Sequence, residues 1–138
     1  MAATVPEITG YKKMAIQYST AVKNSRMLEV VAAIDGGGGV GKLEIGTAGM
    51  ATILSTIPLN ATCGTVAAGT LTFSGFPKTD TNTANGGTAA AARIRAYNNV
   101  DIITGLTVGT SSSDVIIDET EILIGQKLTV TLASITHR

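Results

Sequence analysis

The segment from Gly36 to Lys42 carries the residue types that a phosphate-binding loop uses. Four residues separate Gly36 from Gly41, and Lys42 follows directly, so the spacing is close to that of a P-loop. A P-loop binds phosphate because it follows a strand and opens a helix whose N-terminus faces the anion. Here a helical pattern precedes the glycines, a strand pattern follows them, and Leu43 stands where a Mg²⁺-binding Ser or Thr is needed. The sequence therefore favours a flexible helix-to-strand connection over a nucleotide site.

Carboxylates gather in the last quarter of the chain, at Asp114, Asp118, Glu119 and Glu121. Two kinds of chemistry use such a group, namely calcium binding and the acid pair of a glycosidase. The spacing matches no EF-hand loop, and no second acidic cluster offers a partner across a cleft. A solvated acidic turn is the favoured interpretation, with calcium binding and catalysis as alternatives.

The single histidine and the single cysteine add little chemistry. His137 is the penultimate residue, where fraying is expected, whereas a catalytic triad needs a held imidazole. Cys63 has no His or basic residue within ten positions, so we expect a small filler in or near a strand rather than a nucleophile. One thiol also excludes an intrachain disulfide and a Cys-based zinc site. We therefore expect no catalytic site, no metal site and no cofactor, and a protein that is not an enzyme.

The composition argues for contact with partners. Charged residues make up 14% of the chain, against roughly 25% in an average soluble domain. A monomer usually keeps more charge to resist association, so part of the surface is expected to be buried against other proteins. The net charge of zero lacks the basic field of a nucleic-acid binder, and no segment resembles a membrane-surface helix. We therefore expect neither nucleic acid nor membrane as a partner.

One helix is expected over about residues 20–35. Ser19 or Thr20 can accept hydrogen bonds from the free amides of its first turn. Apolar residues at helical spacing give one stripe for the core, which consists of Met27, Val30, Val31 and Ile34. Gly36 is expected to end the helix in the left-handed conformation.

After Gly41 the apolar period changes from 3.6 to 2, which indicates strands. The expected strands lie within 42–45, 50–59, 69–76, 88–97, 100–109, 115–125 and 127–136. Leu128, Val130 and Leu132 are expected to face inward from the last of them. Residues 77–87 form the longest polar break and are the expected mobile loop. Short strands with frequent turns predict a mainly β fold, a two-sheet antiparallel sandwich of jelly-roll or immunoglobulin-like type.

The chain is expected to comprise an arm and one domain. Residues 1–18 show no periodic apolar face and predict an extended N-terminal arm. Residues 19–138 predict a single β-sandwich domain. The N-terminus lacks the apolar region of a signal peptide, and no stretch of about 18 apolar residues could span a membrane. We therefore expect the protein to be made in the cytoplasm of its host.

Arg93 and Arg95 project from the same face of the strand expected over 88–97, opposite Ala92 and Ile94. Arginines on an exposed strand are often only solvated. Because charges are few in this chain, a patch for an acidic partner surface remains the alternative.

Several segments together resemble small structural proteins of tailed bacteriophages. The opening segments are "YSTAVKNSRMLEVVAAIDGG" and "KLEIGTAGMATIL", and the closing ones are "GTAAAARIRAYNN", "GLTVGTSSSDVIID" and "GQKLTVTLASITHR". Within that group, the size and β pattern resemble the capsid cement, or decoration, proteins. The resemblance covers roughly residues 16–138, whereas residues 1–15 of the arm lie outside it and the glycine run looks longer than in the group.

The resemblance implies a jelly-roll-like homodimer on the outside of an icosahedral shell, where it bridges major capsid subunits and has no enzyme activity. The expected partners are the major capsid protein and a second copy, and the expected location is the outer capsid surface of the virion. The expected capsid-contacting residues are Tyr11, Lys12 and Lys13 of the arm, with Arg93 and Arg95. Two alternatives stay open, a phage tail or tail-tube accessory protein and a β-sandwich adhesin, although few aromatic residues count against the adhesin.

Overall fold

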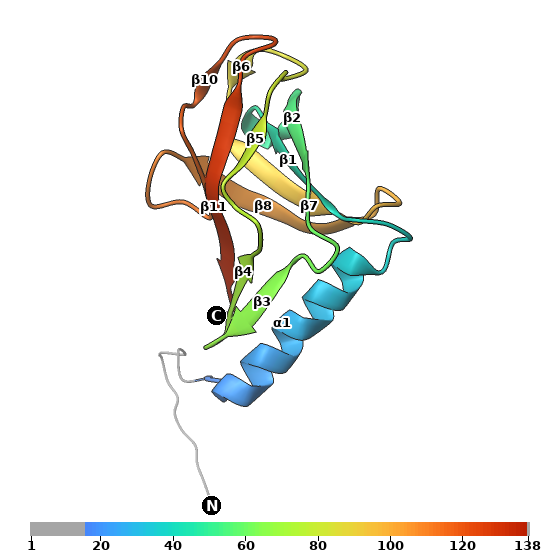
Figure 1. The fold of residues 1–138 in the computed structure, drawn as a ribbon. Coiled ribbons are helices and arrows are strands. Elements are labelled where there is room, and N and C mark those ends of the chain that lie inside the picture. Colours follow the sequence, from blue (N-terminus) through green and yellow to red (C-terminus); the bar gives the residue numbers. More distant parts are fainter. Residues whose placement is uncertain (1–15, 138) are drawn as a thin grey trace, which may run out of the picture.

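The computed structural model describes residues 16–137, in which one helix packs against a large curled sheet (Figure 1). The helix is α1 (Thr20–Asp35), and a short 3₁₀ turn, η1 (Ala48–Met50), follows the first strand. The strands in chain order are β1 (Lys42–Gly46), β2 (Ile53–Pro58), β3 (Gly64–Ala67), β4 (Thr70–Phe73), β5 (Lys78–Asp80), β6 (Gly87–Thr88), β7 (Ala91–Arg95), β8 (Asp101–Gly109), β9 (Val115–Ile117), β10 (Glu121–Ile122) and β11 (Leu128–Thr136).

Most strands belong to one mixed sheet. Its order is β2-β1-β7-β8-β9-β11-β4-β3, β5 also pairs with β11, and β10 and β6 form a separate ribbon. All pairs are antiparallel except β8 and β9, which run parallel over two residue pairs. The mainly β class with one helix is confirmed. A two-sheet jelly-roll sandwich is not confirmed, because the large sheet curls into a half-barrel instead.

The start of α1 follows from its sequence. Ser19 Oγ accepts a hydrogen bond from the Val22 amide at 3.2 Å and so satisfies a free amide of the first turn. The residues that face the sheet are the expected stripe of Met27, Val30, Val31 and Ile34. This stripe packs the helix against β3 and β4 and closes one side of the core.

The end of α1 is fixed by a contact with a distant residue, which the sequence of the helix does not predict. The backbone amide of Cys63 donates a hydrogen bond to Asp35 Oδ1 at 3.2 Å. Gly36 follows with a φ of −88°, so the expectation of a left-handed Gly36 is wrong. The left-handed residue is Gly38, with a φ of +93°, and it lies within the connection to β1.

The glycine run is explained by close packing. A Cβ on Gly37 would lie 2.9 Å from the backbone nitrogen of Tyr97. A Cβ on Gly41 would lie 2.5 Å from Ile34 Cγ2 and 3.1 Å from the Arg95 carbonyl oxygen. Only a residue without a Cβ allows backbones to approach this closely. The run therefore lets the chain cross the end of β7, and the expectation of a merely flexible connection is incomplete.

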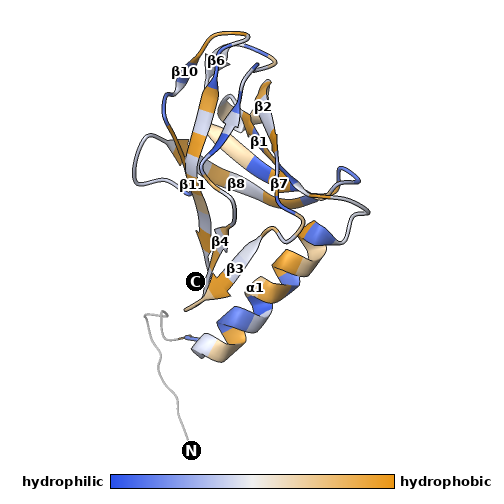
Figure 2. Cartoon of the chain, viewed as in Figure 1, coloured by the Kyte–Doolittle hydropathy of each residue, from blue (hydrophilic) through white to orange (hydrophobic). Residues whose placement is uncertain are grey.

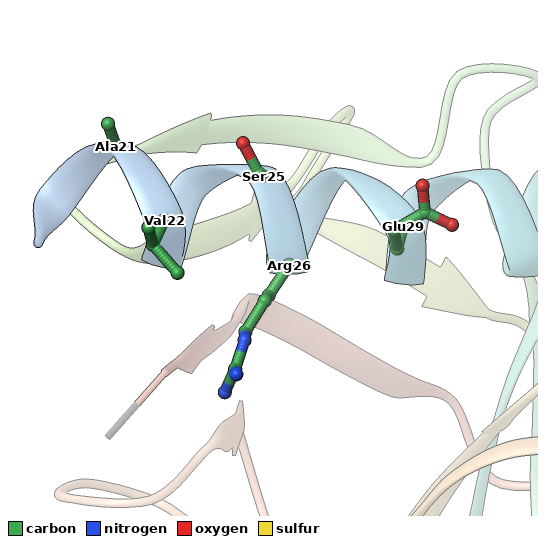
Figure 3. A pocket seen from close by; sticks show the side chains of 5 residues that line it. All are labelled: Ala21, Val22, Ser25, Arg26 and Glu29. Carbon is green, nitrogen blue, oxygen red and sulfur yellow. The ribbon is translucent and has the colours of Figure 1, made fainter. Parts of the chain in front are cut away.

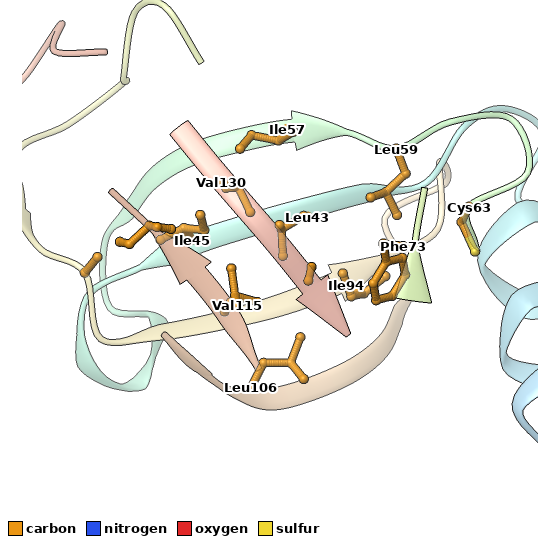
Figure 4. Packing of buried hydrophobic residues seen from close by; sticks show 14 of the residues in the cluster. Leu43, Ile45, Ile57, Leu59, Cys63, Phe73, Ile94, Leu106, Val115 and Val130 are labelled. Carbon is orange, nitrogen blue, oxygen red and sulfur yellow. The ribbon is translucent and has the colours of Figure 1, made fainter. Parts of the chain in front are cut away.

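The core lies inside the curl of the sheet (Figure 4). Leu43 and Ile45 of β1 and Ala92 and Ile94 of β7 are fully buried, as the alternation in the sequence predicts. In the antiparallel register Leu43 lies opposite Ile94, so two large side chains meet at the centre. Cross-strand contacts of this kind are the main source of sheet stability.

The last strand departs from simple alternation. The register of β11 against β9 shifts between Val130 and Leu132, which inserts an extra residue into β11. As a result Ala133 is buried, while Leu132 is 41% exposed. The expectation that Leu132 faces inward is wrong, and those for Leu128 and Val130 are confirmed.

The polar segment 77–87 contains strand pairing that its composition does not predict. It contains β5, which pairs with the start of β11. Thr83 is 2% exposed and donates its hydroxyl proton to the Leu123 carbonyl oxygen at 3.0 Å. The expectation that the segment is a loop throughout is therefore wrong, because β5 lies within it.

Candidate partner-binding surface

The outer side of β1, β7 and β8 carries a row of paired charges, which we call the charged row. Alternation places Glu44, Arg93 and Arg95 on the face opposite the core. The antiparallel register sets Glu44 opposite Arg93 and Arg95 opposite Asp101. Among residues 16–137, every ion pair lies in this row. The face on which the sequence predicted Arg93 and Arg95 is thus the face that carries these ion pairs.

Glu44 is the centre of the row. Its Oε1 accepts a hydrogen bond from Arg93 Nε at 2.6 Å and lies 3.8 Å from Arg95 Nε. The Glu44 side chain is only 10% exposed. A carboxylate this buried needs its cationic partners, since an unpaired charge there would be costly.

The end of the row is formed by Arg95 and Asp101. Arg95 Nε donates to Asp101 Oδ1 at 2.5 Å. This hydrogen bond lowers the pKa of the Asp101 carboxyl and raises the pKa of the Arg95 guanidinium. Both groups therefore stay charged at neutral pH.

The two arginines retain donors for a partner. Each uses its Nε atom inside the row, and no hydrogen bond within residues 16–137 engages their terminal nitrogens. A hollow of about 470 Å³ lies beside Arg93, with Met50, Ala91 and Thr104 among its walls. Guanidinium groups fixed in this way are suited to bind a carboxylate of another protein through two parallel bonds.

Two further surface features have apolar character. A hollow of about 310 Å³ lies along the N-terminal half of α1 and is lined by Ala21, Val22, Ser25, Arg26 and Glu29 (Figure 3). We call it the helix groove.

The second feature is the turn between β10 and β11. It exposes Leu123 and Ile124 by 74% and 72%, respectively. Figure 2 shows this hydrophobic turn at the end of the molecule that lies opposite α1. We call it the aliphatic turn.

The sequence did not reveal either apolar feature. "EILIG" reads as the end of a strand, so Leu123 and Ile124 were not separated from the core residues around them. The signal that was present is Gly125, whose φ of +79° closes the turn directly after the two aliphatic residues.

Of the other residues singled out in the sequence, Lys42 borders this surface, because it lies opposite Arg95 in the register of β1 and β7. Tyr11, Lys12 and Lys13 lie outside the described residues. Lys42 donates to Asn99 Oδ1 and begins β1, so the helix-first order that argues against a P-loop is confirmed. Within residues 16–137, no three His, Cys, Asp or Glu side chains are close enough to hold a metal ion.

The four carboxylates of the acidic segment make separate local contacts. Asp114 accepts from the Thr107 amide at 3.0 Å and Asp118 from the Thr129 amide at 3.2 Å. Glu119 bonds the Gln126 side chain, and Glu121 bonds the Thr88 hydroxyl. These partners are spread over the surface, so the carboxylates do not converge on one point.

His137 is held rather than frayed. Its backbone amide donates to the Gly69 carbonyl oxygen at 2.8 Å, and its ring stands edge-on to Tyr18 with centroids 5.9 Å apart. Arg26 lies over the same Tyr18 ring, with its Cζ 4.1 Å from the centroid. These contacts join the start of α1 to the end of β11, which is a structural role.

Cys63 is fully buried, as expected for a small filler. Burial, assisted by the nearby Asp35 carboxylate, raises the pKa of the Cys63 thiol from 9.0 to about 12. We expect a thiol reagent to leave the folded protein unmodified at pH 8 and to modify it on denaturation. Mass spectrometry after brief labelling measures this, and rapid modification of the folded chain would contradict the burial.

The same pKa shift has a consequence for alkaline stability. The unfolded chain releases the Cys63 proton above pH 9.0, whereas the folded chain holds it to about 12. The contribution of the Cys63 thiol to the free energy of unfolding is therefore fully present below pH 9 and is lost as the pH rises toward 12.

No helix within residues 16–137 has the length and apolar character needed to cross a membrane. Comparisons of the chain with models of protein families, with curated proteins and with solved structures found no match.

Proposed function

We propose that this chain is a structural protein of a tailed-bacteriophage virion, which binds the outside of an icosahedral capsid and cements neighbouring major capsid subunits. It acts by contact, without catalysis and without a cofactor. Its partners are the major capsid protein and a second copy of itself, and it is made in the host cytoplasm before it joins the outer capsid surface.

The observation that supports the proposal most is where the resembling segments lie. "GTAAAARIRAYNN" contains β7, "GLTVGTSSSDVIID" contains the last five residues of β8 together with β9, and "GQKLTVTLASITHR" contains β11. These strands are consecutive in the sheet. The resemblance to cement proteins therefore falls on one continuous part of the fold. We include in the proposal that the curled sheet is a variant of their jelly-roll-like sandwich.

The surface chemistry suits a cement. Arg93 and Arg95 are held by carboxylates of their own chain but keep free terminal donors, which fits an acidic surface of a capsid subunit. Each such contact is weak, because exposed charge pairs contribute about 0–1 kcal/mol. Many copies on one shell add these contacts at high effective concentration, so the sum stabilises the capsid.

The copy number of the chain in purified virions tests the proposal directly. Quantitative mass spectrometry against the major capsid protein is expected to give a ratio near one, or a simple fraction of it. A handful of copies per virion would favour the tail or tail-tube alternative. Absence from the virion would overturn the proposal and return the adhesin to consideration.

A second experiment tests the contact residues. Arg95→Lys keeps the charge pair with Asp101 but loses the planar fork that binds a carboxylate through two bonds. We expect it to weaken binding of the purified protein to shells that lack it, with an unchanged melting temperature. Replacement of both Lys12 and Lys13 by Ala is expected to do the same, and Lys78→Ala in β5 is the control. Unchanged binding in both variants would contradict these contacts.

A further inference from the structure

The aliphatic turn is built to hold two apolar side chains in water. The Thr83 hydroxyl and the backbone amide of Gln126 both donate to the Leu123 carbonyl oxygen. The backbone amide of Gly125 donates to the Thr83 carbonyl oxygen. The Leu123 amide in turn donates to Gln126 Oε1 at 2.9 Å. A turn fixed from several sides cannot fold its side chains inward, so Leu123 and Ile124 stay exposed.

Exposure of apolar side chains to water is unfavourable in free energy, and burial of these side chains in a contact with another surface would be favourable. Burial of a Leu or Ile side chain is worth about 1.5–3 kcal/mol. Both side chains are more than 70% exposed on neighbouring positions, which forms a rigid apolar knob. Adjacent exposed aliphatic residues on a held backbone are typical of an interaction site.

The helix groove has the chemistry to receive this knob. Val22 is 42% exposed, and together with Ala21 it gives the groove an apolar wall. The volume of about 310 Å³ suits a small number of aliphatic side chains. The groove and the aliphatic turn lie at opposite ends of the molecule (Figure 1), so one copy cannot bring its own turn to its own groove.

The charges beside the two features are complementary. Lys127 follows the aliphatic turn, and Glu121 precedes it. The helix groove carries one charge of each sign, Arg26 and Glu29. Arg26 is held over the Tyr18 ring, so Glu29 is the charge of the groove that a second copy can meet with Lys127 while the apolar groups meet.

We propose that the aliphatic turn of one copy docks in the helix groove of a second copy. The contact joins unlike surfaces, so it forms either a closed antiparallel pair, in which it occurs twice, or a longer chain of copies. The inference rests on the part of the proposed function that names a second copy as a partner, and it does not involve capsid binding. A test without capsids therefore separates this contact from the contact with the capsid.

The first test is the solution mass of the purified full chain over a range of concentrations, by sedimentation equilibrium. We expect association, and replacement of both Leu123 and Ile124 by Ser is expected to weaken it by roughly 100-fold, because two apolar contacts are lost. Val100→Ser removes a side chain of 52% exposure elsewhere and is expected to leave association unchanged. A monomer at every concentration, or association that the double replacement does not weaken, would overturn the proposal.

Cysteine cross-linking gives a test that holds even where the double replacement fails to fold. Copies with Ile124→Cys are mixed with copies that carry Ser25→Cys in the groove, under mild oxidation. Cys63 is buried and does not interfere. We expect a disulfide-linked species that is much more abundant in the mixture than with either variant alone. Equal amounts in all three samples would contradict docking in the groove.

Charge reversal tests the orientation. Glu29→Lys and Lys127→Glu are each expected to weaken association by roughly fivefold, and their combination in one chain is expected to restore it. Failure of the combined variant to recover would overturn the pairing of Lys127 with Glu29.

Discussion

Gly41→Ala is expected to lower the free energy of unfolding by about 3 kcal/mol, the upper part of the usual range for overpacking. The added methyl would lie 2.5 Å from Ile34 Cγ2 and 3.1 Å from the Arg95 carbonyl oxygen. Ile34 is fully buried, so it has no free space into which to move. The clash therefore pushes α1 away from the end of β7. Urea denaturation followed by circular dichroism measures the change.

Gly38→Ala is the matched control within the same glycine run. No atom lies within 4 Å of the position of its Cβ, but its φ is +93°. We expect a loss of about 1 kcal/mol from backbone strain alone. Equal losses in the two variants would contradict the close-packing explanation of Gly41 and would restore the flexible-connection interpretation.

The local pattern of the sequence predicts the strands that carry the charged row. Alternation over β1 and β7 correctly placed Leu43 and Ile94 inside and Arg93 outside, because a strand exposes successive side chains to opposite faces. The helix, with a cap at Ser19 or Thr20, was predicted for a similar reason, since capping depends on neighbours in the chain, and Ser19 is the cap.

Features that depend on distant partners were not predictable in the same way. The bulge that exposes Leu132 arises from the pairing of β11 with β9, and the parallel contact of β9 with β8 depends on the curl of the sheet. The pairing of Arg93 with Glu44 joins positions 49 residues apart in the chain. Period and spacing report which face a residue occupies, but they do not report which strand lies beside it.

The charged row also changes how Arg93 and Arg95 are interpreted. The sequence offered two interpretations, a solvated sheet face or a patch for a partner. The structure places both arginines in ion pairs with side-chain exposures of 20% and 24%, so neither is simply solvated. A fixed guanidinium loses less freedom on binding than a mobile one, which makes the patch interpretation physically stronger.

Ile94→Ala is expected to lower the free energy of unfolding by about 3 to 4 kcal/mol, as for other large-to-small changes in a core. Ile94 is fully buried at the centre of β7 and lies opposite Leu43 of β1 (Figure 4). On its other side it lies opposite Ile103 of β8. The strands on both sides are fixed by hydrogen bonds, so the cavity cannot close by a shift of one side chain. Urea denaturation provides the measurement, and Val100→Ala, at a side chain of 52% exposure, is expected to change stability by less than about 0.5 kcal/mol.

The same variant separates stability from binding. Ile94 and Arg93 are neighbours in β7 but project to opposite faces of the sheet. Ile94→Ala is therefore expected to unfold more readily while the molecules that remain folded bind their partner with unchanged affinity. Arg95→Lys is expected to behave in the opposite way. If Ile94→Ala weakened binding as strongly as Arg95→Lys at a temperature where both are folded, the charged row would depend on the core beneath it and would not be an independent contact surface.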